Sequence, residues 1–281
     1  MLWLYFVLAN AFFWGTWNIL ARKFLKEEHD YLGFSTMYQF VGAAIALPFA
    51  LTDPSFSLEA LALSVVVASS VAWSASAVLT SRSLQLVEVS LRDPLSRTGI
   101  FWALLFSFLL LGESITLNKV IGVIAIFAGI VVIYFKIKLG NLRAYGVALT
   151  LLTGVFGGFA VSVDKIGMKF FSPVFYNFLL FILPGIMLFF GTRRNAGKMK
   201  MFFYKNKLVI IILSAFATFS YLCLLSALRL QQASIVLPVS QIGLIISVVG
   251  GIFLLKEKEG IARKIIGSLI VLAGAALVSA S

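Results

Sequence analysis

Ten long apolar windows follow one another along the sequence, mostly separated by short polar joints. At about 1.5 Å per residue, each window is long enough as a helix to cross roughly 30 Å of hydrocarbon. A lone strand in lipid would leave its backbone polar groups unpaired, and the windows are too long and uniformly apolar for barrel strands. The sequence therefore predicts an all-α, polytopic membrane protein with ten transmembrane helices, near residues 2–21, 33–51, 58–80, 88–111, 119–136, 144–163, 173–191, 208–229, 233–255 and 261–280.

The composition also favours a lipid bilayer as the surroundings of this chain. Hydrophobic residues make up 61% of the 281 residues and charged residues 12%, whereas soluble domains are about half apolar and about a quarter charged. The net charge of +12 would suggest nucleic acid for a soluble protein. Here the basic residues lie in the joints, so topology and anionic lipid headgroups explain them better. We expect a lipid bilayer and no nucleic acid as partner.

The N-terminal window is expected to be a retained helix. It follows Met1 directly, without a positively charged region before it or a small-residue cleavage site after it.

The joint from Thr192 to Lys207 is the longest, carries six basic residues and has no apolar pattern of its own. We expect it to be a solvated loop that faces lipid headgroups.

Basic residues are distributed unevenly between the two sides. Of the 23 Lys and Arg residues, 18 lie in odd-numbered joints and four in even-numbered joints. We expect the protein to lie in the cell membrane. The positive-inside rule then predicts that the odd joints face the cytoplasm and that both termini lie on the outer side.

An internal repeat is visible at an offset of 144 residues. Several residues around the fourth window have identical partners around the ninth, namely Ser90, Pro94, Ser96, Gly99, Leu110, Leu111 and Glu113 with Ser234, Pro238, Ser240, Gly243, Leu254, Leu255 and Glu257. After a slip of one residue, Lys119, Gly122 and Gly129 match Lys264, Gly267 and Gly274. Five windows per half is an odd number, so the second half must be inserted in the opposite sense. The sequence predicts two inverted five-helix repeats, at residues 1–139 and 140–281, of the kind that supports alternating access.

The duplicated proline-bearing helix and the segments Leu110-Leu111-Gly112-Glu113 and Leu254-Leu255-Lys256-Glu257, each before a glycine-rich helix, resemble the EamA branch of the drug/metabolite transporter superfamily. The resemblance covers the whole chain. It implies a secondary transporter of amino acids, sugars, nucleotide sugars, drugs or related metabolites, with a central cavity lined by the first, third and fourth helices of each half. It also implies cytoplasmic termini, opposite to the charge count, so the orientation stays open.

Charged residues within the fourth window are the first candidates for binding a substrate. Asp93 and Arg97 lie four apart on one helical face, where an ion pair would lower the cost of burying both. Arg97 then offers planar donors to an anionic substrate group, unless it snorkels with Arg92 to the membrane boundary. Gln241 occupies the repeat-related position beside Ser240 and is a second polar candidate, although hydrogen bonding between helices would also explain both residues.

Aromatic and polar residues on other helices extend this candidate cavity. Trp14 and Asn18 share one face of the first helix, which lines a cavity or packs against neighbouring helices. Trp73 and Tyr221 are further candidates. Pro94 and Pro238 lie inside their helices, and each is expected to cause a kink.

Asp164 and Lys165 lie near the end of the sixth window. We expect them to mark the membrane interface; the alternative is a buried acid that carries a coupling proton.

These observations predict a secondary active transporter of a small metabolite, coupled to an ion or a counter-substrate. No G-x-x-x-x-G-K-[ST] loop is present, so a gradient must supply the energy. His29 is the only histidine and Cys223 the only cysteine, which argues against an enzyme, a metal site or a cofactor. The alternatives are a flippase of a lipid-linked intermediate and a membrane sensor or scaffold that transports nothing.

Overall fold

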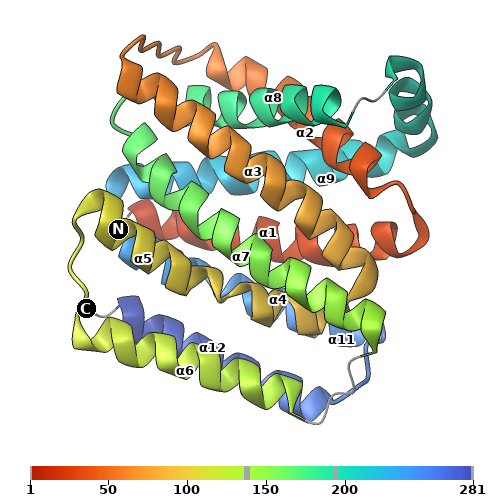
Figure 1. The fold of residues 1–281 in the computed structure, drawn as a ribbon, viewed down its shortest axis with the longest axis vertical. Coiled ribbons are helices and arrows are strands. Elements are labelled where there is room, and N and C mark those ends of the chain that lie inside the picture. Colours follow the sequence, from red (N-terminus) through yellow and green to blue (C-terminus); the bar gives the residue numbers. More distant parts are fainter. Residues whose placement is uncertain (1, 136–139, 193–194, 280–281) are drawn as a thin grey trace.

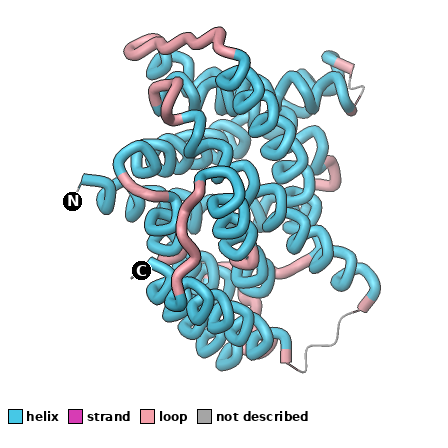
Figure 2. Tube along the Cα trace, turned by 60° about the vertical axis from the view of Figure 1, so that its left-hand side comes forward, coloured by secondary structure: helices cyan, strands magenta, loops and turns pink. Residues whose placement is uncertain are grey.

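The fold is helical throughout the part of the chain that the structure describes. This computed structural model describes residues 2–135, 140–192 and 195–279, which contain helices and loops but no strand (Figure 2). The helices are α1 (Leu2–Glu27), α2 (Tyr31–Ala50), α3 (Ala60–Leu86), α4 (Val89–Ser96), α5 (Gly99–Leu111), α6 (Leu117–Tyr134), α7 (Asn141–Gly167), α8 (Pro173–Gly191), α9 (Ala196–Leu230), α10 (Ala233–Ser240), α11 (Gly243–Phe253) and α12 (Ile261–Ser279).

The helices have the length and surface of membrane spans. Among the described residues, nine helical stretches are long and apolar enough to cross a bilayer, with α4 and α5 together forming one of them. The apolar helix α11 is shorter. Large hydrophobic side chains face outward, and Phe12, Leu109 and Ile124 are all more than half exposed. Such a surface requires lipid as its solvent, so the chain is an integral, multi-pass membrane protein.

The helices pack as pairs in an elongated stack. In Figure 1, α2 and α8 lie together at the top, and α6 and α12 lie together at the bottom. Between them, α3 packs against α7, and α1 packs against α9. Both ends of the described chain lie on the same side of the stack (Figure 1).

Two helices are interrupted in the middle of the stack. The helix that starts at Val89 stops two residues after Pro94, and α5 begins three residues further on. α10 and α11 are separated in the same way after Pro238, whose side chain lies outside the described part of the chain. The break after Pro94 is a tightening of the helix, because the N–H groups of Arg97 and Thr98 donate to the carbonyls three residues earlier, those of Pro94 and Leu95.

Glycines bring α6 and α12 into close contact. A Cβ on Gly122 would lie 2.5 Å from the carbonyl oxygen of Gly274, and a Cβ on Gly129 would lie 2.6 Å from that of Gly267. The reverse holds as well, since a Cβ on Gly267 or Gly274 would lie 2.6 Å from the carbonyl oxygen of its partner. Small residues at this spacing let helix backbones approach closely in a membrane. We call this contact the α6–α12 seam.

A methyl group in this seam should destabilise the protein. Gly129→Ala places a Cβ against a backbone oxygen that cannot move alone, so we expect a loss of about 1–3 kcal/mol, as for other overpacked sites. Thermal unfolding of the purified protein measures the effect. Gly140→Ala is the matched control, because nothing lies within 4 Å of a Cβ there. Equal unfolding temperatures for the two variants would contradict close packing at the seam.

The long basic joint is not the loop that the sequence predicts. α9 begins at Ala196, within that joint, and only Asn206 departs from helical geometry, with φ −120° and ψ 16°. The expectation was wrong because Met199 and Phe202, three residues apart, are buried at 4% and 8% exposure. These two side chains give the segment an apolar face that packs on the bundle.

Candidate functional site

A cavity of about 220 Å³ lies inside the helix stack. Its walls are formed by residues of α1, α2, α3, α4, α5, α7, α8, α9 and α10, together with Arg97 in the break after α4 and Gln241 in the break after α10. Of the described residues, none from α6, α11 or α12 lines it. The cavity therefore draws on both halves of the sequence.

Most of the residues that the sequence predicts for a cavity lie on its wall. Six line it, namely Trp14, Trp73, Arg97, Tyr221, Ser240 and Gln241. Asn18 and Asp93 do not line the cavity, and both are completely buried. Each instead makes a hydrogen bond to a lining arginine.

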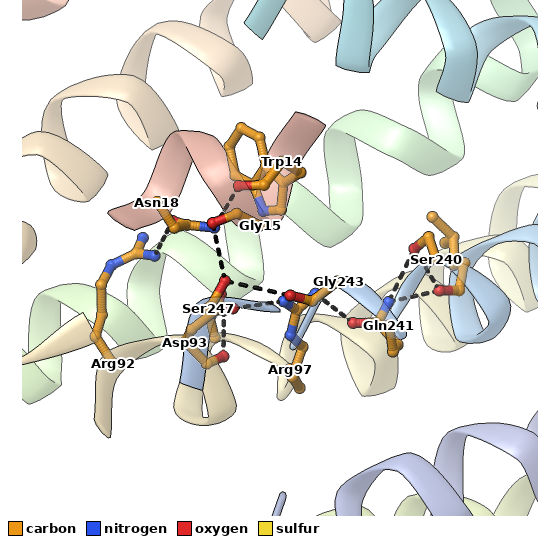
Figure 3. A network of polar contacts seen from close by, with 12 residues as sticks. Trp14, Gly15, Asn18, Arg92, Asp93, Arg97, Ser240, Gln241, Gly243 and Ser247 are labelled. Carbon is orange, nitrogen blue, oxygen red and sulfur yellow. Dashed lines mark hydrogen bonds and ion pairs between the residues drawn. The ribbon is translucent and has the colours of Figure 1, made fainter. Parts of the chain in front are cut away.

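Arg97 joins the two repeat-related positions (Figure 3). Its Nη2 lies 2.8 Å from Oδ2 of Asp93, which is the ion pair expected from their spacing. Its Nη1 donates to Oε1 of Gln241 at 2.5 Å. Gln241 is held in turn by donating to the Leu237 carbonyl and to Oγ of Ser240. A charged group from the first half thus meets a polar group from the second half at the cavity wall.

Arg92 also lines the cavity and does not snorkel to the membrane boundary. It is 1% exposed, and all three of its partners are neutral. Nε donates to Oγ of Ser83 at 2.9 Å, Nη2 to Oγ1 of Thr80 at 3.1 Å, and Nη1 to Oδ1 of Asn18 at 3.4 Å (Figure 3 shows the last). The alternative placement at the boundary was wrong because α3 presents hydroxyl groups beside α4. In the sequence, Thr80 and Ser83 lie three residues apart on one helix, and this pair of hydroxyl groups was the signal that could have predicted buried partners for Arg92.

Aromatic side chains form other parts of the wall. Trp14 stacks on Trp17, with ring centroids 4.9 Å apart and an interplanar angle of 4°. Trp73 and Tyr221 meet edge to face, with centroids 5.2 Å apart. Offset and edge-to-face pairs of this kind hold flat rings in fixed positions.

Asp164 is completely buried behind this aromatic wall, three residues before the end of α7. Its carboxylate accepts hydrogen bonds from the hydroxyls of Ser69, Tyr176 and Tyr221, and from Nε1 of Trp73 at 3.0 Å. Donors from α3, α8 and α9 therefore enclose the carboxylate, so it does not face lipid headgroups directly. Across the described ranges, no three acidic, histidine or cysteine side chains gather as a metal ion would need.

A polar cluster around Glu257 lies at one end of the bundle. Oε1 accepts from the backbone N–H of Val89 at 2.9 Å, and Oε2 accepts from the N–H and the hydroxyl of Ser90 at 2.9 and 2.5 Å. Nε of Arg22 lies 3.9 Å from Oε1, and Arg22 also donates to the carbonyl of Leu84. Glu257 therefore joins the start of α4 to α1 and, through Arg22, to the end of α3. We call this set the Glu257 cluster.

A second cluster, which we call the Lys165 cluster, contains Lys165, Leu228, Gln231 and Glu113. Nζ of Lys165 donates to the carbonyls of Leu228 and Gln231 at the end of α9. Glu113 lies close enough to Lys165 to attract its charge. Oε2 of Glu113 is buried and has no hydrogen-bond partner among the described residues.

The two clusters lie at opposite ends of α7. Near its start, Arg143 forms an ion pair at 3.9 Å with Glu88, the residue that precedes α4. Lys165 lies near its end. At 1.5 Å per helical residue, these two positions are separated by about 33 Å, which is the thickness of the hydrocarbon core.

Comparisons with known proteins agree with this architecture. A protein of Listeria innocua serovar 6a named "Putative sugar uptake protein lin0215" is 25% identical over 290 residues, covering 96% of each chain. A solved crystal structure superposes with a TM-score of 0.66 at 12% identity, covering 99% of this chain and 96% of the other. That likeness shows the fold alone.

The family model named "EamA-like transporter family" matches the chain twice, at residues 1–135 and 144–280. The two matches cover nearly the whole sequence and include the cavity and both polar clusters. The chain therefore belongs to the EamA-like transporter family, and it is a membrane transporter of small solutes.

Proposed function

We propose that this protein is a secondary active transporter that carries a small metabolite across a cell membrane by alternating access. Its two halves, residues 1–139 and 140–281, would be inverted five-helix repeats that move about the central cavity. The observation that carries the proposal is the presence of two related polar clusters at opposite ends of the bundle, with the cavity built from both halves.

The glycine contacts support an inverted repeat with ten spans. With the offset of 145 residues, Gly122 corresponds to Gly267 and Gly129 to Gly274. The contact of Gly122 with Gly274 then becomes the contact of Gly129 with Gly267, as a two-fold relation between halves requires. The matching breaks after Pro94 and Pro238 support the same relation, with α10 and α11 together forming the ninth span.

The polar clusters support two gates. Arg22 of α1 donates to the carbonyl of Leu84, and Lys165 of α7 donates to that of Leu228, which is 144 residues later. Glu113 follows α5 in the first half, and Glu257 follows α11 in the second half. Each end of the bundle thus carries a basic residue from one half and a glutamate from the other half.

The two gates differ in this structure. Glu257 is 7% exposed and accepts three hydrogen bonds, whereas Oε2 of Glu113 has no partner among the described residues. We propose that the Glu257 cluster is closed here, and that the Lys165 cluster closes in the opposite state. A cavity of about 220 Å³ favours a small solute over a lipid-linked intermediate.

Flux measurements with the purified protein test this function. We expect proteoliposomes to take up at least one member of a labelled panel of sugars, amino acids and organic acids, with saturable kinetics. The first probe is glucose, given the name of the Listeria relative. Arg97→Ala should reduce the flux at least tenfold by removing two hydrogen bonds at the cavity wall, about 1.4 kcal/mol or more.

The matched control is Arg229→Ala, since Arg229 is exposed at the end of α9 and does not line the cavity. This variant should transport as the unmodified protein does. Specific binding of a panel member without any flux would overturn the transport proposal and indicate a sensor or scaffold.

A further inference from the structure

We infer that the transported solute is a small organic anion, whose carboxylate or phosphate group binds between Arg92 of α4 and Arg97, which directly follows α4. The inference rests on the proposed transport function and names the class of solute that the same cavity takes.

Unused hydrogen-bond donors are the first observation. A guanidinium group has five N–H donors. Arg92 uses three of them on Ser83, Thr80 and Asn18, so two are left without a partner within the described ranges. Arg97 uses two, on Asp93 and Gln241, and its buried Nε has no partner there. Buried donors of this kind are costly unless a ligand satisfies them.

Uncompensated charge is the second observation. Asp93 compensates Arg97 at 2.8 Å, but Arg92 has no carboxylate within ion-pair distance among the described residues. The two arginines and Asp93 therefore leave one positive charge at the cavity wall. A buried charge without a counter-charge is strongly unfavourable in a membrane interior. A bound oxyanion would supply both the negative charge and the acceptor atoms, and guanidinium groups match its geometry.

The other buried acid near the cavity does not compensate Arg92. Asp164 is completely buried, lies behind the rings of Trp73 and Tyr221, and does not line the cavity. It already accepts four hydrogen bonds. This leaves the negative charge beside Arg92 to come from the solute.

The aromatic wall indicates an organic body on the anion. The polar atoms of Trp73 and Tyr221 are occupied by Asp164, so these side chains present ring carbons to the cavity. Trp14 adds a third ring, held flat by its stacking on Trp17. Inorganic phosphate or sulfate would leave these apolar surfaces without contact.

Matched pairs of neutral and anionic probes test the inference. We expect gluconate or glucose 6-phosphate to bind at least about tenfold more tightly than glucose, and phenylacetate more tightly than 2-phenylethanol, because charge-assisted bonds to guanidinium are strong. The measurements are thermal stabilisation of the purified protein and flux into proteoliposomes. The two sugar-derived probes distinguish a carboxylate from a phosphate.

Charge substitutions on α4 give the decisive comparison. Arg92→Gln should remove the preference for the anion, while the exposed-site control Arg229→Gln should keep it. Because Arg92 is buried, Arg92→Lys serves if the glutamine variant does not fold, and it should retain the preference with weaker binding. Asp93→Asn raises the positive charge at the wall and should increase stabilisation by the anion, compared with Asp53→Asn at an exposed position.

The outcomes separate this inference from the transport proposal. Equal flux of a neutral probe and its anion, unchanged by Arg92→Gln, would overturn the anion site and leave the transporter standing. Weaker anion binding by Asp93→Asn would also overturn the anion site. Anion binding that depends on Arg92 without any flux would support the site and contradict transport.

Discussion

Asp164→Asn should lower the free energy of unfolding by about 3 kcal/mol or more, since each buried donor left unsatisfied costs about 1–3 kcal/mol. Four donors from three helices converge on the carboxylate. An asparagine amide has one oxygen and adds two N–H groups that face other donors. Thermal unfolding of the purified protein measures the loss. Solute affinity should fall as well, because Trp73 and Tyr221 lose the group that holds them.

Two other variants set the scale for this effect. Asp53→Asn changes an exposed aspartate and should have little effect. Tyr221→Phe removes one of the four donors together with its own need for a partner, so it should cost less than Asp164→Asn. If Asp164→Asn unfolds at the same temperature as Asp53→Asn, the four-donor site does not stabilise the bundle.

Glu257→Ala should open the gate that, in our proposal, the Glu257 cluster closes. The substitution leaves two N–H groups and one hydroxyl at the start of α4 without their acceptor. At about 1 kcal/mol each, their loss shifts the equilibrium between gate states by more than tenfold. Flux against a gradient should fall in the same proportion. A cysteine at the cavity-lining position Ser76, in a background with Cys223→Ala, reports the opening. Its labelling by an impermeant thiol reagent from the Glu257 end should accelerate at least tenfold.

Glu259→Ala is the matched control for this experiment. Glu259 lies two residues away and pairs with Arg143 at 3.0 Å, but it is 41% exposed, so its ion pair contributes less than about 1 kcal/mol. Labelling from the Glu257 end should then stay at the rate of the parent protein. An unchanged labelling rate in Glu257→Ala itself would refute the gate.

Local spacing predicts part of the site. Asp93 and Arg97 are four residues apart, and helical geometry alone places them on one face. The offset of 144 residues relates Arg97 to Gln241, and the structure brings the two into contact. The same offset predicts matching prolines, but not that the regular α-helical hydrogen bonding is interrupted two residues later.

The remaining site residues depend on neighbours that are distant in sequence. Arg92 lies one turn from the start of its helix, where a basic residue usually reaches the headgroups, yet hydroxyls of α3 and Asn18 of α1 enclose it. Asp164 likewise owes its burial to donors on α3, α8 and α9. Periodicity in one window cannot identify such partners, because it does not say which helices pack together.

The α6–α12 seam has a mechanical consequence. Its glycines hold two helices in backbone contact, and neither helix supplies a described residue to the cavity. In the proposed alternating access, this contact would serve as the pivot between the two halves, because it lies beside the cavity and contributes nothing to its walls. We therefore expect a cross-link between α6 and α12 to leave the transport rate unchanged.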